Sequence, residues 1–371
     1  RQVDVSIACW PWGAYLGDDA VEKGVRMKIS SWTRHDHNTM PPASKTTGNY
    51  VNSSLAKVEA LKAGYDEAIM LAPSGLIAEC TGENIFVARH GTLLTPPLSA
   101  GALEGIRAYE TADGPAVFRL TDHIERLFSS AQIMGMEIPY TVDELVAATK
   151  ETVASTGLES CYIRPIAYFG YGEMGLNTLP CSVDVSIACW PWGAYLGDDA
   201  VEKGVRMKIS SWTRHDHNTM PPASKTTGNY VNSSLAKVEA LRAGYDEAIM
   251  LAPNGLVAEC TGENIFVARH GKLLTPPLSA GALEGITQNS VSTIAADLGF
   301  EVVVDNIARS DLYIAEEAFV CGTAAEVSSV NSVDDRKIPC PGPMTSAIAE
   351  VYHEAIRGKD PRYAHWCEPV H

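Results

Sequence analysis

Apolar and polar residues alternate along this chain in patterns that predict both helices and strands. In residues 122–134 the apolar positions follow one face of a helix. Thr141 followed by Glu144 has the spacing of a capping box and predicts a helix that ends at Gly157. Further helices are predicted over residues 232–243, 286–298 and 345–356, and strands over 162–169, 183–189, 247–251, 264–268 and 302–304. This mixture lacks a regular strand–helix alternation, which favours an α+β fold over a doubly wound sheet.

A long internal repeat dominates the organisation of the chain. Residues 3–106 recur at residues 183–286, at an offset of 180 positions. The copies differ only at the pairs Lys62/Arg242, Ser74/Asn254, Ile77/Val257 and Thr92/Lys272. Solenoid repeats are shorter and more divergent, so this is a recent duplication or an assembly artefact. We predict three pieces: residues 1–106 as a partial copy of a larger domain, 107–182 as a small α/β domain lacking its N-terminal strands, and 183–371 as the complete larger domain.

The net charge and the cysteine content limit the partners and the cellular compartment that we expect for this chain. The formal net charge of the 371-residue chain is −16, which disfavours nucleic acid and anionic membrane surfaces as partners. The nine cysteines are odd in number and form no Cys-x-x-Cys pair, as expected for free thiols in a reducing, cytoplasmic compartment. No apolar run reaches the roughly 18 residues that a membrane span needs. We therefore expect a cytoplasmic protein.

Two motifs resemble ligand sites but are better explained as loops. Residues 170–175 match the dinucleotide fingerprint G-x-G-x-x-G, yet no helix start follows to hold a pyrophosphate, so we expect a turn. The triplet His-Asp-His occurs at 35–37 and again at 215–217. Two ligands without a third make a weak metal site, so we expect a polar loop and no metal.

Four further motifs carry candidate chemistry when they are taken together. They are a lysine among small polar residues (224–230), Glu-Cys-Thr-Gly-Glu-Asn-Ile-Phe (259–266), Gly-Ala-Leu-Glu-Gly-Ile-Thr (281–287) and Cys-Gly-Thr-Ala-Ala-Glu (321–326). Alone, each is an ordinary surface lysine, acidic turn, capped helix or small-residue turn. A site for pyridoxal 5′-phosphate (PLP) needs a reactive lysine, backbone N–H donors for a phosphate and a carboxylate for the ring nitrogen.

In this order and spacing the motifs resemble the branched-chain amino-acid aminotransferases, PLP enzymes of fold type IV. Phe118-Arg119 before residues 122–127, Tyr162-Ile-Arg-Pro, and residues 191–197 are also similar to that family. The resemblance covers residues 107–371 almost continuously, and residues 3–106 through the repeat. It implies a small α/β domain beside a larger cofactor domain, with the first repeat copy as an extra partial larger domain.

The resemblance also implies roles for individual residues. Lys225 is the catalytic lysine. Cofactor-binding residues are Arg119, Tyr230, Glu259, Gly285, Ile286, Thr287 and Thr323. Substrate-binding residues are Tyr162, Arg164, Trp192, Tyr195 and Ala324. The implied substrates are Leu, Ile and Val with 2-oxoglutarate as amino acceptor. The implied assembly is a homodimer, with residues 172–179 as the partner-facing loop, provided that the duplicated segment permits it.

The sequence departs from the family pattern near the first junction. Leu98 and Leu103 stand where the family has a tyrosine and a phenylalanine. The first copy has Lys45 but lacks the phosphate-side threonine and the Gly-Thr-Ala-Ala turn, so we expect Lys45 to bind no PLP productively. Alternatives stay open: a D-amino-acid aminotransferase or aminodeoxychorismate lyase of the same fold, or an inactive rearranged product.

Overall fold

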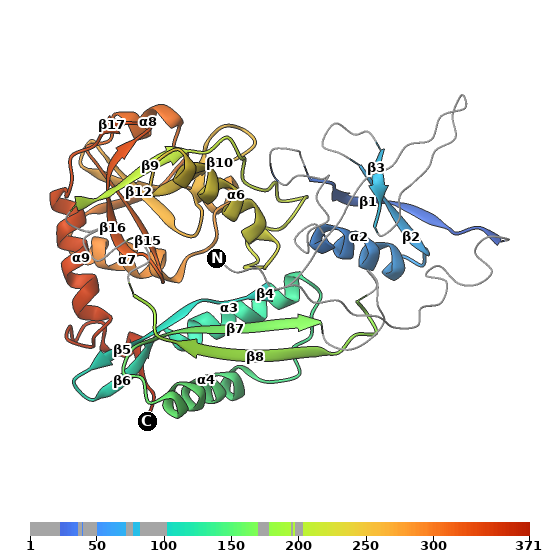
Figure 1. Ribbon diagram of the computed structural model, residues 1–371, viewed down its shortest axis with the longest axis horizontal. Helices are drawn as coiled ribbons and strands as arrows, with labels where there is room; N and C mark the ends of the chain where they lie inside the picture. The colour runs from blue at the N-terminus through green and yellow to red at the C-terminus, as the bar shows by residue number, and fades with distance from the viewer. Residues whose placement is uncertain are drawn as a thin grey trace.

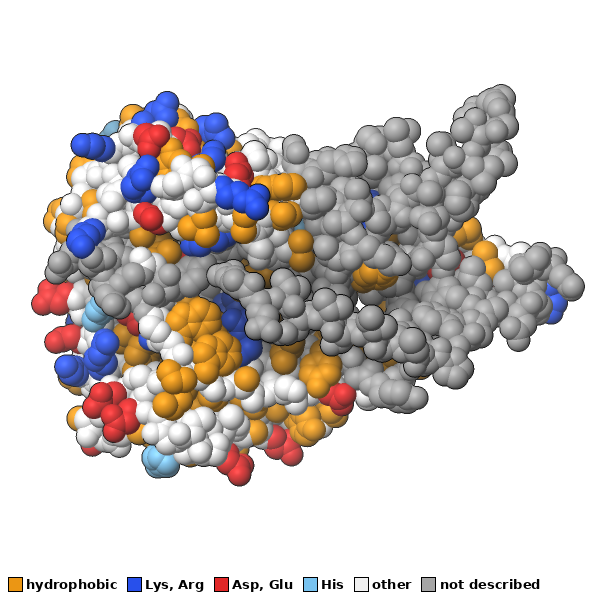
Figure 2. All heavy atoms as spheres, viewed as in Figure 1, with side chains coloured by type: hydrophobic (Ala, Val, Ile, Leu, Met, Phe, Trp, Pro, Cys, Tyr) orange, Lys and Arg blue, Asp and Glu red, His pale blue; other side chains and the backbone are white. Residues whose placement is uncertain are grey.

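A computed structural model describes residues 23–35, 39, 50–71, 77–81, 102–169, 178–193, 196 and 203–371. The described chain forms three β-sheets, each with its own helices (Figure 1). Among these residues, no helix is both long and apolar enough to cross a bilayer. Lys and Arg side chains lie close to Asp and Glu on much of the described surface in Figure 2, so the acidic excess is interspersed with positive charge.

One of the three sheets is antiparallel and has six strands. It comprises β4 (Ala102–Leu103), β5 (Ile106–Thr111), β6 (Gly114–Phe118), β7 (Cys161–Phe169), β8 (Val183–Trp190) and β18 (Cys367–Pro369). The strand order is β18-β6-β5-β7-β4, and β8 pairs along the whole of β7. α3 (Leu120–Ile133) and α4 (Val142–Thr156) cover one face, and their apolar side chains bury Ile106 and Ile163. The predicted capping box of Thr141 and Glu144 is confirmed at the start of α4.

The predicted boundary between the second and third pieces differs from the structure. We placed residues 183–189 at the start of the larger domain, but β8 belongs to the six-stranded sheet, and so does β18 from the C-terminus. Ala102 and Leu103, from the end of the first repeat copy, also pair with β7. The ends of the repeat mark where the sequence was duplicated. Strand pairing, however, decides which residues belong to a sheet, so the two boundaries need not coincide.

The largest sheet has nine strands in the order β11-β10-β9-β16-β15-β12-β13-β14, with β17 paired to β16. These strands are β9 (Val205–Ile209), β10 (Glu247–Leu251), β11 (Val257–Cys260), β12 (Asn264–Arg269), β13 (Lys272–Thr275), β14 (Glu301–Val304), β15 (Glu317–Gly322), β16 (Glu326–Val333) and β17 (Arg336–Lys337). Its helical segments are α6 (Asn229–Arg242), η1 (Leu278–Ala280), α7 (Ile286–Asp297), α8 (Arg309–Tyr313), α9 (Pro343–Ala355) and η2 (Ala364–Trp366). The strands and helices predicted for this region are confirmed to within a few residues.

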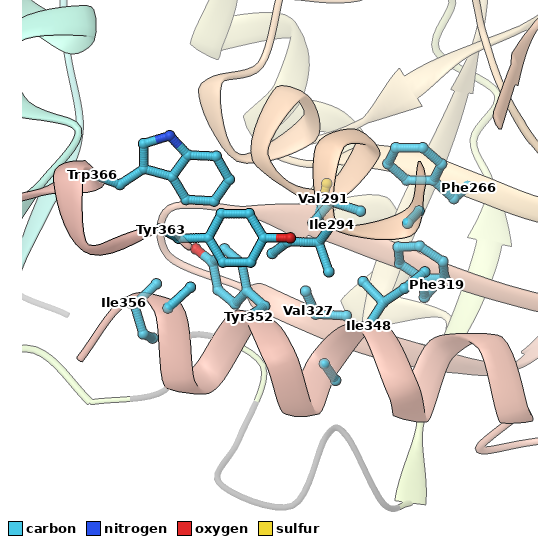
Figure 3. Close-up of a cluster of buried hydrophobic side chains, with 14 of the residues drawn as sticks. Phe266, Val291, Ile294, Phe319, Val327, Ile348, Tyr352, Ile356, Tyr363 and Trp366 are labelled. Atoms are coloured by element: carbon cyan, nitrogen blue, oxygen red, sulfur yellow. The ribbon is translucent and has the colours of Figure 1, made fainter. Parts of the chain in front are cut away.

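An aromatic core joins α7 and α9 to this sheet (Figure 3). The rings of Phe266 and Phe319 stack at a centroid distance of 5.0 Å, and those of Tyr363 and Trp366 at 4.5 Å. Tyr352 of α9 is buried in the same cluster. Burying each such side chain contributes about 1.5–3 kcal/mol, so this core fixes where α7 begins relative to the sheet.

The third sheet belongs to the first repeat copy and contains β1 (Met27–Thr33), β2 (Glu67–Leu71) and β3 (Ile77–Cys80), with α2 (Tyr50–Lys62). Its strands pair in the register of β9, β10 and β11, shifted by 180 positions. The first copy lacks one strand pairing of the second copy. In the second copy β9 also pairs with β16, whereas no described strand pairs with β1 in the equivalent position. Ile29 is therefore 59% exposed, whereas its equivalent Ile209 is 3% exposed.

Candidate active site

Lys225 lies in the segment before α6, where the six-stranded sheet and its helix α3 approach it. Its backbone N–H donates to the Ser130 hydroxyl of α3 at 3.1 Å, and its carbonyl accepts from the Leu103 N–H at 2.8 Å. The six-stranded unit thus holds the backbone of the lysine, while α6 carries Tyr230 one turn further on. The Lys225 amine hydrogen-bonds the Tyr230 hydroxyl and lies 5.5 Å from the centre of that ring.

The charge of the lysine is set by these neighbours. Burial lowers the pKa of the Lys225 ammonium, but Tyr230 and the Glu104 carboxylate outweigh that effect, so the pKa lies above its ordinary value. The amine is therefore protonated at neutral pH and must lose this proton before it can attack a carbonyl carbon. The Tyr230 oxygen accepts a hydrogen bond from the ammonium and so fixes its direction.

Glu259 is a buried carboxylate at the end of β11 that faces the same cavity. One carboxylate oxygen lies 2.5 Å from the Arg214 guanidinium, and the other accepts from the Leu283 N–H at 2.9 Å. The cavity between the elements is lined by Lys225, Tyr230, Glu259, Arg214, Leu283 and Glu263, among others. Three of the residues predicted from the sequence are thus brought together around one space.

The N-terminus of α7 follows directly after Leu283, which lines the cavity. Gly285 is its N-cap, and a Cβ there would lie 2.0 Å from the Asn264 Oδ1 atom, so only glycine allows this close approach. The first N–H groups of a helix have no partner within the helix, and they favour an anion. Thr287 is buried beside them, and its hydroxyl bonds that of Tyr352.

Arg119 reaches the same helix from the six-stranded unit. Its guanidinium donates to Asn289 Oδ1 at 2.7 Å and to the Ser290 hydroxyl at 3.0 Å. The residue has φ 51° and ψ 44°, a left-handed conformation that costs a non-glycine residue roughly 1–2 kcal/mol. Strained backbone of this kind concentrates at functional positions, and here it aims a positive charge at the start of α7.

Aromatic and cationic side chains on β7 and in the segment after β8 form a third group, in which Tyr162 is close enough to Lys225 for the two charges to interact. The ring of Tyr162 lies 4.5 Å from that of Trp192 between centroids, and its hydroxyl accepts from Arg164 Nη2 at 2.8 Å. Arg164 Nε is buried and lacks a hydrogen-bond partner among the described residues. Thr323 and Ala324 form the turn between β15 and β16, and the neighbouring Gly322 packs against the Gly262 carbonyl at the cavity.

Several sequence-based candidates stay outside this arrangement. Tyr195 and residues 170–177, which include most of the expected partner-facing loop, lie outside the described residues, and so does Lys45. His215 is buried and turns toward His35 of the first copy.

Sequence reasoning missed a buried ionic network beside the site. Glu104 is fully buried and bonds Arg126 through both oxygens, at 2.6 and 2.8 Å, and His123 at 3.0 Å. Arg126 also donates to the Glu284 carbonyl at 2.7 Å, directly before the α7 N-cap. The signal available in the sequence was the run of charges at 122–126 on an otherwise apolar helix.

Comparison with known proteins agrees with this geometry. The family model for class IV amino-transferases matches residues 1–113 and again residues 107–333. The branched-chain-amino-acid aminotransferase of Pseudomonas aeruginosa is 47% identical over 268 residues, which is 72% of this chain and 87% of that protein. The protein of the same name from Escherichia coli K12 is 41% identical over 271 residues, again 72% and 87%. The chain belongs to the class IV aminotransferases.

Solved structures place it in the same branch of that family. A branched-chain aminotransferase from Thermoproteus uzoniensis with norvaline superimposes with a TM-score of 0.71 at 46% identity, covering 73% of this chain and 90% of that one. The branched-chain amino acid aminotransferase of Thermobaculum terrenum in its PLP form gives 0.70 at 37% identity, covering 73% and 89%. The fold is thus the mixed α+β fold of these aminotransferases, which confirms the α+β part of the predicted fold class and the predicted family.

Proposed function

We propose that this chain transaminates branched-chain L-amino acids with PLP as cofactor and 2-oxoglutarate as amino acceptor. The observation that carries the proposal is the joint placement of Lys225, Tyr230 and Glu259 around one buried cavity. Its support from relatives is the similarity to enzymes of that name, one of which has been solved both with pyridoxamine 5′-phosphate and with N-(5′-phosphopyridoxyl)-L-glutamate.

The residues present fit a PLP molecule in their donor chemistry. A buried carboxylate, Glu259, suits a protonated ring nitrogen, and Arg119 with the N–H groups of Ile286 and Thr287 suits a phosphate dianion. The N–H groups of the Thr323–Ala324 turn are a second set of anion donors. Bound PLP supplies an aldehyde that accepts the amino group and a ring that withdraws electrons.

The protein's own groups divide the remaining work. Lys225 holds the cofactor and then carries a proton to and from the substrate Cα, and Tyr230 orients its amine. Arg214 contacts one oxygen of Glu259 and fixes the direction of its carboxylate. Tyr162 and Trp192 provide an apolar wall for Leu, Ile or Val side chains, and Arg164 provides positive charge for a dicarboxylate acceptor.

We also propose that residues 1–106 are an extra partial copy of the larger domain, beside a small domain and a complete larger domain. The equal registers of β1–β2–β3 and β9–β10–β11 support this division. The exposure of Ile29, which has no described strand like β16 beside it, supports the view that the copy is incomplete.

Reduction with borohydride tests which lysine holds the cofactor. Tryptic peptides around Lys45 and Lys225 are identical, so the map must use cyanogen bromide, which cuts after the methionines at 40, 70, 220 and 250. Fragments 41–70 and 221–250 then differ in mass through Lys62 and Arg242. We expect the pyridoxyl label on 221–250, and label confined to 41–70 would overturn the assignment.

Two matched variants complete the test. Lys225→Ala is expected to lose both the label and transamination of leucine, while Lys45→Ala keeps both. A folded protein that transaminates D-amino acids instead of leucine, or one that takes up no PLP at all, contradicts the proposed function and favours one of the alternatives.

A further inference from the structure

Glu326 is the first residue of β16, directly after the turn of residues 323–325, and its backbone has a conformation that usually belongs to glycine. Its φ angle is 53°, in the left-handed region, and the residue pairs with Gly322 across the turn. Tight hairpins commonly place glycine at left-handed positions, because a Cβ is strained there. A glutamate in this conformation therefore needs compensating contacts from its side chain, and such outliers concentrate at functional positions.

The Glu326 carboxylate meets side chains from two other elements. Arg107 of β5 donates through Nη1 at 2.9 Å, and both side chains of this ion pair are largely buried. The hydroxyl of Tyr109, also on β5, hydrogen-bonds the same carboxylate. His353 Nε2 lies 3.5 Å from the second carboxylate oxygen, and it comes from α9, which runs beside the nine-stranded sheet toward β5 and β6 (Figure 1). Because a buried charge without its partner is costly, these contacts tie β16 to β5.

Arg107 carries the connection on to the segment after β8. Its Nη2 donates to the Trp192 carbonyl at 3.3 Å, while its Nη1 holds Glu326. The guanidinium also lies 5.1 Å from the centre of the Tyr109 ring. A planar guanidinium serves two acceptors in fixed directions, which the single ammonium of a lysine cannot reproduce. One side chain thus links the end of the turn to the Trp192 backbone.

Tyr352 on α9 extends these contacts to the start of α7. Burial and the nearby Glu326 charge raise the pKa of the Tyr352 hydroxyl, which is hydrogen-bonded to Thr287. Arg107 and Thr287 are the residues that follow the two identical Gly-Ala-Leu-Glu-Gly-Ile stretches of the repeat. Both therefore reach the same cluster, although one continues a strand and the other a helix.

We propose that Arg107 and Glu326 are positioning residues that fix the Thr323–Ala324 turn against Trp192. The inference rests on the proposed function, which assigns the N–H groups of that turn to an anion and Trp192 to the substrate wall. The turn belongs to the nine-stranded sheet, whereas Trp192 follows a strand of the six-stranded sheet, so neither sheet alone sets their spacing. The ion pair sets it, and an amino acid and a 2-oxo acid both bring a carboxylate to the turn.

Steady-state kinetics of Glu326→Gln, with PLP in excess, is the first test. Glutamine keeps the length of the side chain but removes the charge that holds Arg107, so the turn and the wall should lose their fixed spacing. We expect KM for leucine and for 2-oxoglutarate to rise roughly tenfold and kcat to change less than about threefold, because carboxylate binding contributes equally to the ground state and the transition state. An unchanged KM for both substrates overturns the proposal, whether or not kcat falls.

A double-mutant cycle tests whether the two residues act as a pair. Arg107→Gln alone should raise both KM values, and the double variant should raise them no further than the worse single variant, since each change releases the same link. Arg107→Lys should give an intermediate KM and serves if the glutamine variant does not fold. Effects that simply add mean that Arg107 acts without Glu326, and they contradict the proposal.

Glu317→Gln is the matched control for loss of stability. Glu317 is a buried glutamate at the opposite end of β15, where its carboxylate accepts from the Met344 and Thr345 N–H groups at the start of α9. This variant should unfold at a lower temperature and keep the KM values of the wild type. If its KM values rise as much as those of Glu326→Gln, general destabilisation explains both and the positioning role is lost.

The unaltered chain separates this inference from the proposed function. A wild type that takes up no PLP and does not transaminate leucine overturns the proposed function, and this inference with it. An active wild type whose Glu326 and Arg107 variants match it in KM overturns the positioning roles alone.

Discussion

One glutamate of the repeat should stabilise the fold and its twin should not. Glu104 and Glu284 both occur in the sequence Gly-Ala-Leu-Glu-Gly-Ile. Glu104 is fully buried, with Arg126 and His123 around its carboxylate, whereas Glu284 is exposed and contributes only its carbonyl to Arg126. Replacing each by glutamine therefore compares a buried ion with an exposed one in identical local sequence.

The expected loss at Glu104 follows from its partners. Glutamine keeps the shape but turns an amide toward the Arg126 guanidinium, which is 13% exposed and keeps its charge. Breaking a buried ion pair in this way costs about 3–5 kcal/mol, and the partial exposure of Arg126 places the value near 3 kcal/mol. The same change at Glu284 should stay within about 0.5 kcal/mol, as for other surface positions.

Thermal unfolding monitored by circular dichroism measures the difference. A loss of 3 kcal/mol lowers Tm by roughly 6–12 °C for a folding unit of about 150–250 residues, and Glu284→Gln should leave Tm nearly unchanged. Equal shifts for the two variants, or no shift at Glu104, would refute the reasoning that burial and pairing decide the contribution.

The pH dependence supplies an internal check. Burial raises the pKa of the Glu104 carboxyl, but Arg126 and His123 outweigh it, and the pKa lies far below its usual range. The stabilisation is therefore complete above the unfolded-state pKa of about 4.3 and is lost as the pH falls below it. The gap between wild type and Glu104→Gln should be full at neutral pH and should shrink in acid.

Three further perturbations test other parts of the structure. Ile209→Thr should destabilise by about 2 kcal/mol because β9 is covered by β16, whereas Ile29→Thr should cost less than about 0.5 kcal/mol, as urea denaturation can verify. Glu259→Gln should lower kcat with leucine by about a hundredfold, since a neutral amide cannot hold a proton on the cofactor ring, and an unchanged kcat contradicts that role. Burial, with the charges of Arg34 and Arg214 nearby, lowers the pKa of His35 to about 3 and that of His215 well below its usual value. Lowering the pH from 6.5 to 5 should therefore weaken the contact between the copies, by about 2 kcal/mol for His35 alone, which faster hydrogen exchange of residues 50–62 would show, and a contact indifferent to pH counts against the buried pair.

Elements with strong local signals were predictable from the sequence. The helix opened by Thr141 and Glu144 carries its own start and stop signals, so its bounds needed no tertiary information. The site was predictable at the level of Lys225 and Glu259 because their motifs recur in a known order. The network of Glu104, His123 and Arg126 was not, because its members gather only when β4, α3 and the start of α7 meet.

The repeat shows why local sequence alone stops short. Residues 101–106 and 281–286 are identical, yet the first stretch contains strand β4 and the start of β5, and the second leads into helix α7. What differs is the chain that follows, Arg107 onward against Thr287 onward, and the partners each meets: Leu103 bonds the Lys225 carbonyl, while Leu283 bonds Glu259. The six-residue sequence is compatible with both the strand and the helix start, so tertiary contacts determine which of them forms.

The same contrast explains how one duplicated segment can serve two purposes. In the second copy, β9 is covered by β16 and Glu259 is oriented by Arg214, so this copy carries candidate chemistry. In the first copy the equivalent strand keeps an exposed face at Ile29, but Asn52, His35 and Val51 contact residues of the second copy. The first copy thus keeps its contacts with the second copy although no described strand covers β1 as β16 covers β9.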